Sequence, residues 1–280
     1  MSYKTISVVI TDKATDSAAL AAAAALVLAH DGHLDVTCLG VDSTRFDALP
    51  MGANAMVLDV AQTEARERAQ ALKTWAEGAL PVGLVQATVQ DLVVSNLGLD
   101  AAIARMTRYA DLVVAGQPYG PGRSILQTAA VEASLFGTPA PVLVVPDRAR
   151  DYARPFGRVM VAWDDSDEAL TAARGALPML QAAGHVDVVL IDPPAHSPER
   201  SDPGGALCLM LTRHGIRTEV SILSRTMPRT AEVMMRFARE HGVDAVVMGA
   251  YGHSRFREAI LGGATRDMLQ AAELPLLMAH

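Results

Sequence analysis

The chain has 280 residues, which is too long for one ordinary domain and suits two of roughly 140 residues each. Half of the residues are hydrophobic but only 4% are aromatic, so the cores must consist mainly of aliphatic side chains, as in parallel sheets covered by helices. A formal net charge of −7 and the lack of a basic stripe argue against nucleic-acid binding.

Cysteine usage and hydropathy indicate a soluble, cytoplasmic protein. Cys38 and Cys208 lie in apolar runs, which predicts buried, reduced thiols. The N-terminus turns polar after a few apolar residues, so we expect no signal peptide. The apolar run at residues 18–29 is too short to cross a bilayer and predicts a buried helix, so we expect no membrane association. No metal-ligand spacing of Cys or His is present in the sequence, so no metal site is expected.

Matching runs of apolar residues occur in the same order in both halves of the chain. Runs 6–12, 111–116 and 140–146 correspond to runs 158–164, 244–249 and 274–279. Such an internal repeat indicates one fold present twice. The polar, proline-broken segment 148–156 is the expected linker between domains 1–147 and 157–280.

Strands and helices are predicted to alternate within the second half. Ser166 is the expected N-cap of a helix that ends near Gly184, and Thr230 the expected N-cap of one that ends at Gly242. Short, continuously apolar strands between helices predict a parallel sheet with helices on both faces. The predicted fold class is therefore α/β, with two tandem doubly wound domains of five parallel strands each. Ligands of such sheets bind at the carboxyl ends of the strands, where the strand order reverses.

The first half has additional residues at 43–71, which include a charged stretch of helix length. Long loops are usually functional or mobile. We therefore interpret this segment as individual to the first domain.

A glycine-patterned loop from Gly249 to Thr265 leaves a predicted strand and ends where a helix begins. Gly249 and Gly252 would let the backbone approach a ligand closely. Gly262 and Gly263 precede the helix, whose free N–H groups and dipole favour an anion. The alternative is that these glycines serve only turns and a helix cap.

The spacing of this loop resembles that of the universal stress protein family. Gly249 and Gly252 are separated by two residues, and nine residues lead from there to Gly262 and Gly263. An earlier motif of this family is matched by residues 161–164, which end in Asp164. The chain is similar to tandem, two-domain bacterial members, strongly in its second half and weakly in its first, and this resemblance implies an adenine nucleotide alpha hydrolase-like fold.

The resemblance also implies that an adenine nucleotide (ATP, ADP or AMP) binds to the second domain. Asp164 and Ile191 would then flank the adenine and ribose. The residues implied to line the phosphates are Gly249, Gly252, His253, Gly262, Gly263, Ala264 and Thr265.

Two residues depart from the family pattern. Gly263 stands where nucleotide-binding members have Ser or Thr, so one hydroxyl contact is lost. Asp165 stands where the family usually has glycine, and its charge would oppose a polyphosphate unless Mg²⁺ intervenes.

The corresponding loop of the first half is expected to be degenerate and without nucleotide. Pro118 and Pro121 remove backbone N–H donors from it. Our alignment places Glu132 near the position of the second half's glycine-rich helix start, where a carboxylate would repel phosphate.

Three functions remain open from the sequence. One is a stress-response protein that acts by binding a nucleotide, the second a nucleotide-free interaction scaffold, and the third a weak ATPase. His253 and Asp164 are the only acid–base candidates, and no catalytic residues are expected. Strands 141–145 and 276–279 are predicted to pair edge to edge around a pseudo-twofold axis, giving an intramolecular pseudo-dimer, and the sequence leaves further homodimerisation open.

Overall fold

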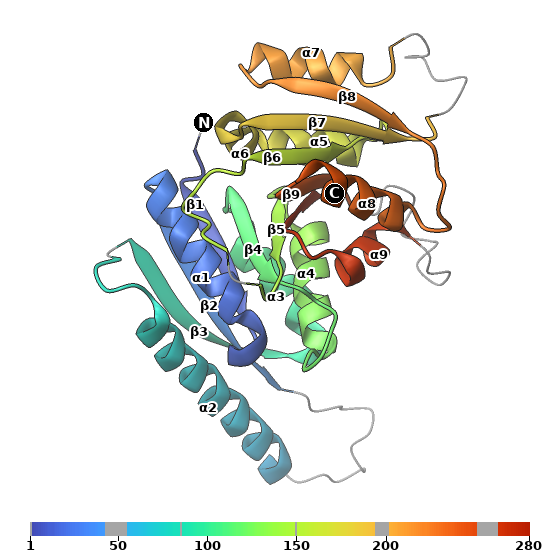
Figure 1. Cartoon of the computed structure of the whole chain (residues 1–280). Coiled ribbons are helices and arrows are strands. Elements are labelled where there is room, and N and C mark those ends of the chain that lie inside the picture. The colour runs from blue at the N-terminus through green and yellow to red at the C-terminus, as the bar shows by residue number, and fades with distance from the viewer. Residues whose placement is uncertain (1, 43–54, 85, 149, 194–201, 251–262) are drawn as a thin grey trace.

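The computed structural model describes residues 2–42, 55–84, 86–148, 150–193, 202–250 and 263–280 (Figure 1). Its strands are β1 Thr5–Ile10, β2 His33–Asp42, β3 Ala87–Ser95, β4 Leu112–Gly116, β5 Val142–Val145, β6 Arg158–Ala162, β7 His185–Ile191, β8 Thr218–Leu223, β9 Ala245–Gly249 and β10 Leu276–Ala279. Its helices are α1 Lys13–His30, α2 Ala55–Ala79, α3 Leu99–Thr107, α4 Ile125–Gly137, α5 Asp167–Gly175, α6 Leu177–Ala182, α7 Gly205–Arg213, α8 Thr230–His241 and α9 Ala264–Ala271.

The strands form one ten-stranded sheet in the order β3-β2-β1-β4-β5-β10-β9-β6-β7-β8. Each half contributes five parallel strands in the same relative order, and the halves meet where β5 and β10 pair antiparallel. Leu277 lies opposite Leu143, flanked by Leu276 opposite Val144 and Met278 opposite Val142. The predicted fold class and the predicted edge-to-edge pairing are both confirmed. The pairing covers two sheet edges that would otherwise offer unpaired backbone groups.

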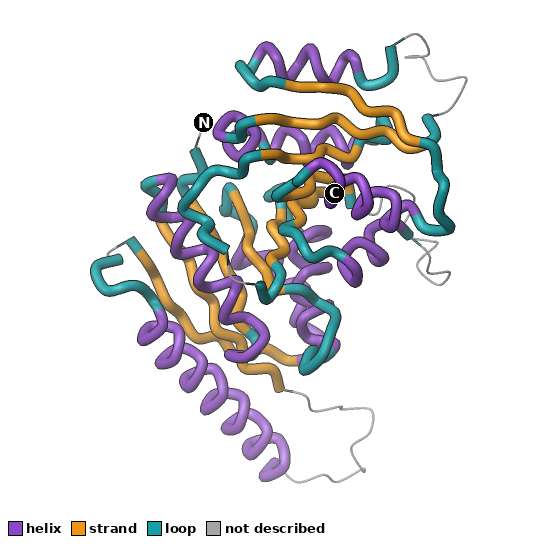
Figure 2. The backbone as a smooth tube through the Cα atoms, viewed as in Figure 1, coloured by secondary structure: helices purple, strands orange, loops and turns teal. Residues whose placement is uncertain are grey.

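Helices cover both faces of the sheet, as Figure 2 shows with helices on either side of the strand layer. One core lies between the sheet and α1, α2, α5, α6 and α7, and contains Leu143 and Leu277. The core of the opposite face includes side chains of α4, α8 and α9 and contains Val144 and Met278. Successive strand residues point to opposite faces, so the central strands must be apolar throughout.

The ends of the helices follow local sequence signals, with two differences from the prediction. Ser166 caps α5 as expected, because its hydroxyl accepts a hydrogen bond from the N–H of Ala169 at 3.1 Å. Thr230 is the first residue of α8 rather than its N-cap, which is Arg229 in an extended conformation. The single helix expected after Ser166 is divided into α5 and α6, because Pro178 lies in the first turn of α6 and cannot donate a backbone hydrogen bond.

The segment interpreted as individual to the first half is in part a regular element of the fold. Helix α2 connects β2 to β3 as α7 connects β7 to β8, so residues 55–71 belong to a helix that both halves have. The expected additional length of the first half is present, since α2 has 25 residues and α7 has 9. Residues 43–54 lie outside the described residues. The backbone of α2 lies directly on β2, since a Cβ atom at Gly40 would lie 1.9 Å from the carbonyl oxygen of Ala65.

The segment expected to be a polar linker packs into the junction of the two halves. Tyr152 and Phe156 are buried there. The guanidinium of Arg150 lies 4.2 Å from the centre of the Phe156 ring and 3.6 Å from a carboxylate oxygen of Asp244. Within the described part of the chain, none of the helices combines the length and apolar character needed to span a membrane.

Candidate functional site

The strand order of the second half reverses between β6 and β9. Strands β6, β7 and β9 are parallel, so they all end at the same edge of the sheet. Asp164 follows β6, while Ile191 and Gly249 are the last residues of β7 and β9. The structure therefore places these three residues at the carboxyl edge, where the reversal leaves a crevice in doubly wound folds.

Asp164 is exposed and forms a turn with the N-cap of α5. Its Oδ1 accepts hydrogen bonds from the Ser166 hydroxyl at 2.6 Å and from the Ser166 N–H at 3.2 Å. This contact fixes the start of α5 relative to the end of β6. Ile191 is half-buried and packs against the core of the α8 and α9 face.

Asp165 has a φ of 63°, in the left-handed region that favours glycine. Aspartate is one of the few other residues that enter this region at modest cost. The backbone conformation thus explains why glycine suits this position. Asp165 directly follows Asp164 and is exposed, so two acidic residues end the connection from β6 to α5 at this edge.

Gly249 is required by packing rather than by an unusual backbone conformation. A Cβ atom there would lie 2.7 Å from the backbone nitrogen of Ala169 and 2.9 Å from the carbonyl carbon of Glu168. Gly116 has the same role at the end of β4, where a Cβ atom would lie 2.8 Å from the carbonyl oxygen of Thr15. In both halves this glycine lets the strand end contact the first turn of the helix that follows the neighbouring strand, which is α5 after β6 and α1 after β1.

Helix α9 begins at the same edge with an N-cap that has no side chain. Gly263 is exposed and extended (φ −87°, ψ 142°), and a Cβ atom there would meet none of the described residues within 4 Å. Ala264 is half-buried, and Thr265 is 6% exposed, so the helix start offers mainly backbone N–H groups. Gly252, His253 and Gly262 lie outside the described residues.

Arg229 adds a positive charge near this helix start, which the sequence alone did not indicate. Its guanidinium lies 3.9 Å from a carboxylate oxygen of Asp267, in the first turn of α9. The Arg229 side chain is 63% exposed, so it is free to turn toward an anion in solvent.

The first half differs at the equivalent helix start. Helix α4 begins at Ile125 with Ser124 as its N-cap, so the alignment of Glu132 with the start of α9 is wrong. Glu132 lies in the middle of α4, because the segment between β4 and α4 (117–124) is shorter than its counterpart between β9 and α9 (250–263).

Side chains of the first half satisfy the N-terminus of α4. The Gln127 Oε1 accepts hydrogen bonds from the Ser124 N–H at 2.7 Å and from the Ser124 hydroxyl at 2.9 Å. The Gln127 Nε2 donates to the hydroxyls of Thr11 at 3.0 Å and Thr15 at 3.3 Å. A capping box and its partners thus occupy the place where the second half has a bare glycine cap.

Asp16 extends this hydrogen-bond network through Thr11, and its side chain is buried, with the residue 4% exposed. Its Oδ2 accepts hydrogen bonds from the N–H and hydroxyl of Thr11, at 2.7 and 2.9 Å, and from the N–H of Asp12 at 3.0 Å. Burial raises the pKa of this carboxyl, and the hydrogen bonds that it accepts offset part of the rise.

Replacing Asp16 by asparagine is expected to change the pH dependence of stability. The folded-state pKa of Asp16 lies above the unfolded one, so the contribution of this group to stability is fully present below the unfolded pKa and is lost as the pH rises through the folded pKa. Asparagine keeps the acceptor without the charge, so the stability of Asp16→Asn relative to wild type should increase with pH over this window and then level off. Urea unfolding at a series of pH values measures this, and a difference that does not vary with pH would contradict it.

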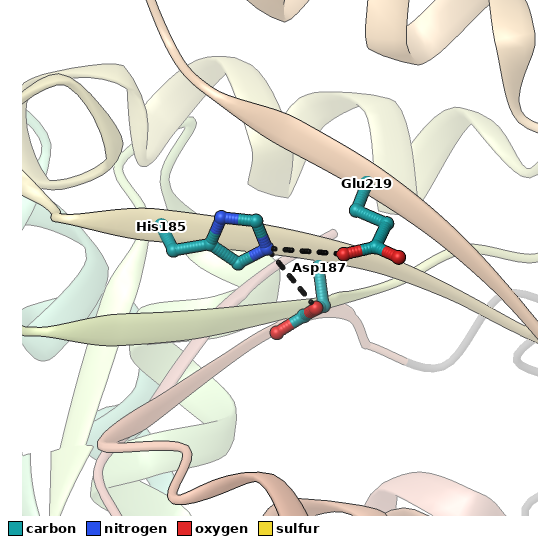
Figure 3. Close-up of side chains that lie close together, drawn as sticks. All are labelled: His185, Asp187 and Glu219. Atoms are coloured by element: carbon teal, nitrogen blue, oxygen red, sulfur yellow. Dashed lines mark ion pairs between the residues drawn. The ribbon is translucent and has the colours of Figure 1, made fainter.

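One group of ionisable side chains outside this edge has the composition of a metal site. Among the described residues, the ligand atoms of His185, Asp187 and Glu219 lie within 4.8 Å of one another (Figure 3). The His185 Nε2 is 3.4 Å from Asp187 and 3.7 Å from Glu219. However, Arg158 already binds both oxygens of Asp187, at 2.6 and 2.7 Å. We therefore interpret the group as an ion-pair network at the start of β6 and β7, away from the carboxyl edge.

Known proteins resemble both the second half and the whole chain. Residues 155–280 match the family model described as "Universal stress protein family". A curated universal stress protein of Synechocystis is 25% identical over 142 residues, which are 50% of this chain and 46% of that protein. The chain therefore spans about half the length of this curated relative.

Two solved structures share the whole fold. A universal stress protein from Archaeoglobus fulgidus aligns over 98% of this chain and 95% of its own, with a TM-score of 0.68 and 16% identity. A putative universal stress protein from Pseudomonas aeruginosa aligns over 99% of this chain and 93% of its own, with a TM-score of 0.56 and 17% identity. These similarities show that the two-part arrangement of the sheet also occurs in other proteins.

Proposed function

We propose that this chain, which belongs to the universal stress protein family through residues 155–280, binds one adenine nucleotide in its second half and acts by binding rather than turnover. The observation that carries this proposal is the start of α9 at Gly263, which lies at the strand-order reversal without a capping side chain. The first N–H groups of a helix have no partner within the helix, and its dipole favours an anion such as phosphate.

The neighbouring residues support this assignment in three ways. Arg229 brings a positive charge to the first turn of α9. Asp164 follows β6 and Ile191 ends the adjacent β7, so a polar and an apolar residue lie at the carboxyl edge, as a ribose and an adenine ring require. Gly252, His253 and Gly262 are assigned to the phosphates by the family resemblance.

The first half is proposed to bind no nucleotide. Ser124 and Gln127 satisfy the start of α4, and Arg123 donates hydrogen bonds to the carbonyl oxygens of Gln117 and Pro121, which holds the preceding loop together. We therefore divide the chain into domain 1–147, connecting segment 148–156 and domain 157–280. Only the last of these would hold a ligand at the carboxyl edge.

We propose binding rather than turnover because Asp164 has a structural role, since its Oδ1 accepts two hydrogen bonds from Ser166, the N-cap of α5. The free thiols Cys38 and Cys208 support a reducing, cytoplasmic location.

The alternative is a nucleotide-free interaction scaffold of the same fold. The observation that favours it is the acidic character of the crevice, where Asp164, Asp165, Asp167 and Glu168 follow β6 in close succession. A polyphosphate would meet like charges there, so nucleotide binding requires Mg²⁺ as a counter-ion.

Matched substitutions at Gly263 distinguish these functions. Gly263→Gln and Gly263→Glu are matched in size, and among the described residues a Cβ atom at this position would meet nothing within 4 Å. A saturating Mg²⁺–ATP concentration, on the order of 100 times Kd, should stabilise wild type by about 2.7 kcal/mol. Gly263→Gln should retain a thermal shift, whereas Gly263→Glu should lose most of it because its carboxylate repels the phosphates. If Mg²⁺–ATP causes no thermal shift of wild type, the scaffold function is favoured. Equal thermal shifts of the two variants would show that the phosphates do not bind at Gly263.

A further inference from the structure

The connection between β4 and α4 in the first half, residues 117–124, contacts helix α9 of the second half. The Gln117 Nε2 donates a hydrogen bond at 2.6 Å to the carbonyl oxygen of Ala272, the C-cap of α9. In the first turn of the same helix, the guanidinium of Arg266 lies 5.6 Å from the centre of the Tyr119 ring, within the range of a cation–π contact. Two side chains of this connection therefore hold α9 near both of its ends.

The connection is itself fixed to the first half. The Arg123 side chain is 5% exposed, its Nε donates to the carbonyl oxygen of Gln117 at 2.6 Å, and its guanidinium pairs with Asp147 after β5. The Thr128 hydroxyl of α4 donates to the carbonyl oxygen of Pro118 at 3.4 Å. The contacts to α9 thus come from a backbone segment that is bound to its own half on both sides.

The first half also contacts the chain next to the end of β9. The rings of Phe136 in α4 and His280 meet edge to face, with their centres 4.8 Å apart. The His280 Nδ1 donates a hydrogen bond at 3.0 Å to the carbonyl oxygen of Ala250, which is fully buried directly after β9. Residues 251–262 lie outside the described residues. The described chain on both sides of them, at Ala250 and at α9, is therefore linked to side chains of the first half.

Helix α9 depends on such contacts because it is short. It has eight residues, and isolated helices shorter than about 12–15 residues are marginal in water. Its first N–H groups bind a phosphate only while the helix is formed and correctly placed, and an apparent affinity falls by the fraction of molecules that are not competent to bind. Contacts that hold α9 in place therefore raise the affinity for an anion without touching it.

We propose that Gln117 and Tyr119 are positioning residues for the nucleotide site, so that the first half sets the nucleotide affinity of the second. This inference rests on the proposed function, because it concerns the same phosphate site at the start of α9. The equivalent connections of the two halves then have different roles, since one leads to the ligand and the other holds the helix that binds it. Binding linkage is reciprocal, so the nucleotide in turn stabilises the contacts between α9 and the first half.

A double variant of the full chain tests the proposal. Gln117→Met keeps the length of the side chain without its donor, and Tyr119→Leu removes the ring that faces Arg266. In isothermal titration with Mg²⁺–ATP, the double variant should bind about tenfold more weakly than wild type, the combined effect of one hydrogen bond and one cation–π contact. Gln117→Met alone is the milder change and should weaken binding about fivefold.

The matched control makes the same substitutions at exposed positions. Gln270 is exposed on α9, and Tyr109 is 78% exposed with the guanidinium of Arg108 5.1 Å from the centre of its ring. Gln270→Met with Tyr109→Leu should bind Mg²⁺–ATP as tightly as wild type. Tyr119→Phe keeps the ring beside Arg266, so it should also retain the wild-type affinity.

Hydrogen exchange without nucleotide gives a readout that does not depend on the ligand. The amides of α9 should exchange faster in the double variant than in wild type, whereas those of β7, which is not adjacent to β4 in the sheet, should not. If the double variant binds as tightly as its control, or if its α9 amides exchange as slowly as those of wild type, the inference is wrong and the proposed function stands. If wild type itself binds no nucleotide, the proposed function fails and the inference fails with it.

Discussion

Replacing Asp187 by alanine is expected to destabilise the chain by about 3–5 kcal/mol, as measured for buried ion pairs that lose one partner. The Asp187 side chain is 1% exposed, and its two oxygens accept hydrogen bonds from the Nε and a terminal nitrogen of Arg158. Removing the carboxylate leaves the guanidinium, whose side chain is 31% exposed, without its main counter-charge. Urea unfolding monitored by circular dichroism measures the effect.

Two controls separate this pair from the rest of the ion-pair network. Glu219→Ala should change stability by no more than about 1 kcal/mol, because the Glu219 side chain is 67% exposed. The double replacement Arg158→Met with Asp187→Leu should recover most of the loss, since apolar residues of similar volume often replace a buried pair without cost. If Asp187→Ala lowers the free energy of unfolding by less than about 1 kcal/mol, the Arg158–Asp187 pair behaves as a solvent-exposed ion pair and the prediction is contradicted.

Leu277→Ala is expected to cost about 2–5 kcal/mol, the range for large-to-small changes in a core. Leu277 is 1% exposed and lies opposite Leu143 in the pair of strands that joins the two halves. Leu277 also lines a cavity of about 150 Å³ at this junction, and truncation would enlarge it, which limits the compensation available from neighbouring side chains. Thermal and urea unfolding of the full chain provide the measurement.

The matched control for this change is Leu28→Ala in α1. Leu28 is 58% exposed, so its truncation should change the free energy of unfolding by no more than about 0.5 kcal/mol. If the two variants were equally stable, the β5–β10 junction would not be a structural core.

Much of the fold could be predicted because the same pattern of apolar runs occurs in both halves of the sequence. The continuous apolar runs around Val113 and Val247 indicate strands buried on both faces, and the prolines before β5 and β10 mark the last strand of each half. The pairing of those strands followed from the need to cover two equivalent edges. N-cap residues such as Ser166 could also be predicted, because a hydroxyl residue before two acidic residues is a strong signal for the start of a helix.

The start of α4 was misplaced because the alignment followed the loop length of the second half. The spacing of Ser124 and Gln127 is that of a capping box, and attention to this local signal would have placed the helix start correctly. The packing of Gly249 against α5 could not be predicted, because it depends on a tertiary contact that the local sequence does not encode.

Other features depend on which residues meet across strands and halves. The contact between Arg158 and Asp187 requires the β6–β7 register, and Glu219 joins them only because β8 lies next to β7. The burial of Tyr152 depends on the packing of the connecting segment against α1 and α6, whereas its charged neighbours suggest an exposed linker. The position of Arg229 beside α9 also could not be predicted from the sequence, because it depends on how α8 and α9 pack in the folded chain.

The binding stoichiometry of Mg²⁺–ATP tests the central claim most directly. Isothermal titration of the purified full chain should give one nucleotide per chain, with binding retained in Gly263→Gln and lost in Gly263→Glu. Two nucleotides per chain would show that the capped start of α4 also accepts phosphate. No binding at all, with no nucleotide released on denaturation, would contradict the account and leave the chain as a scaffold.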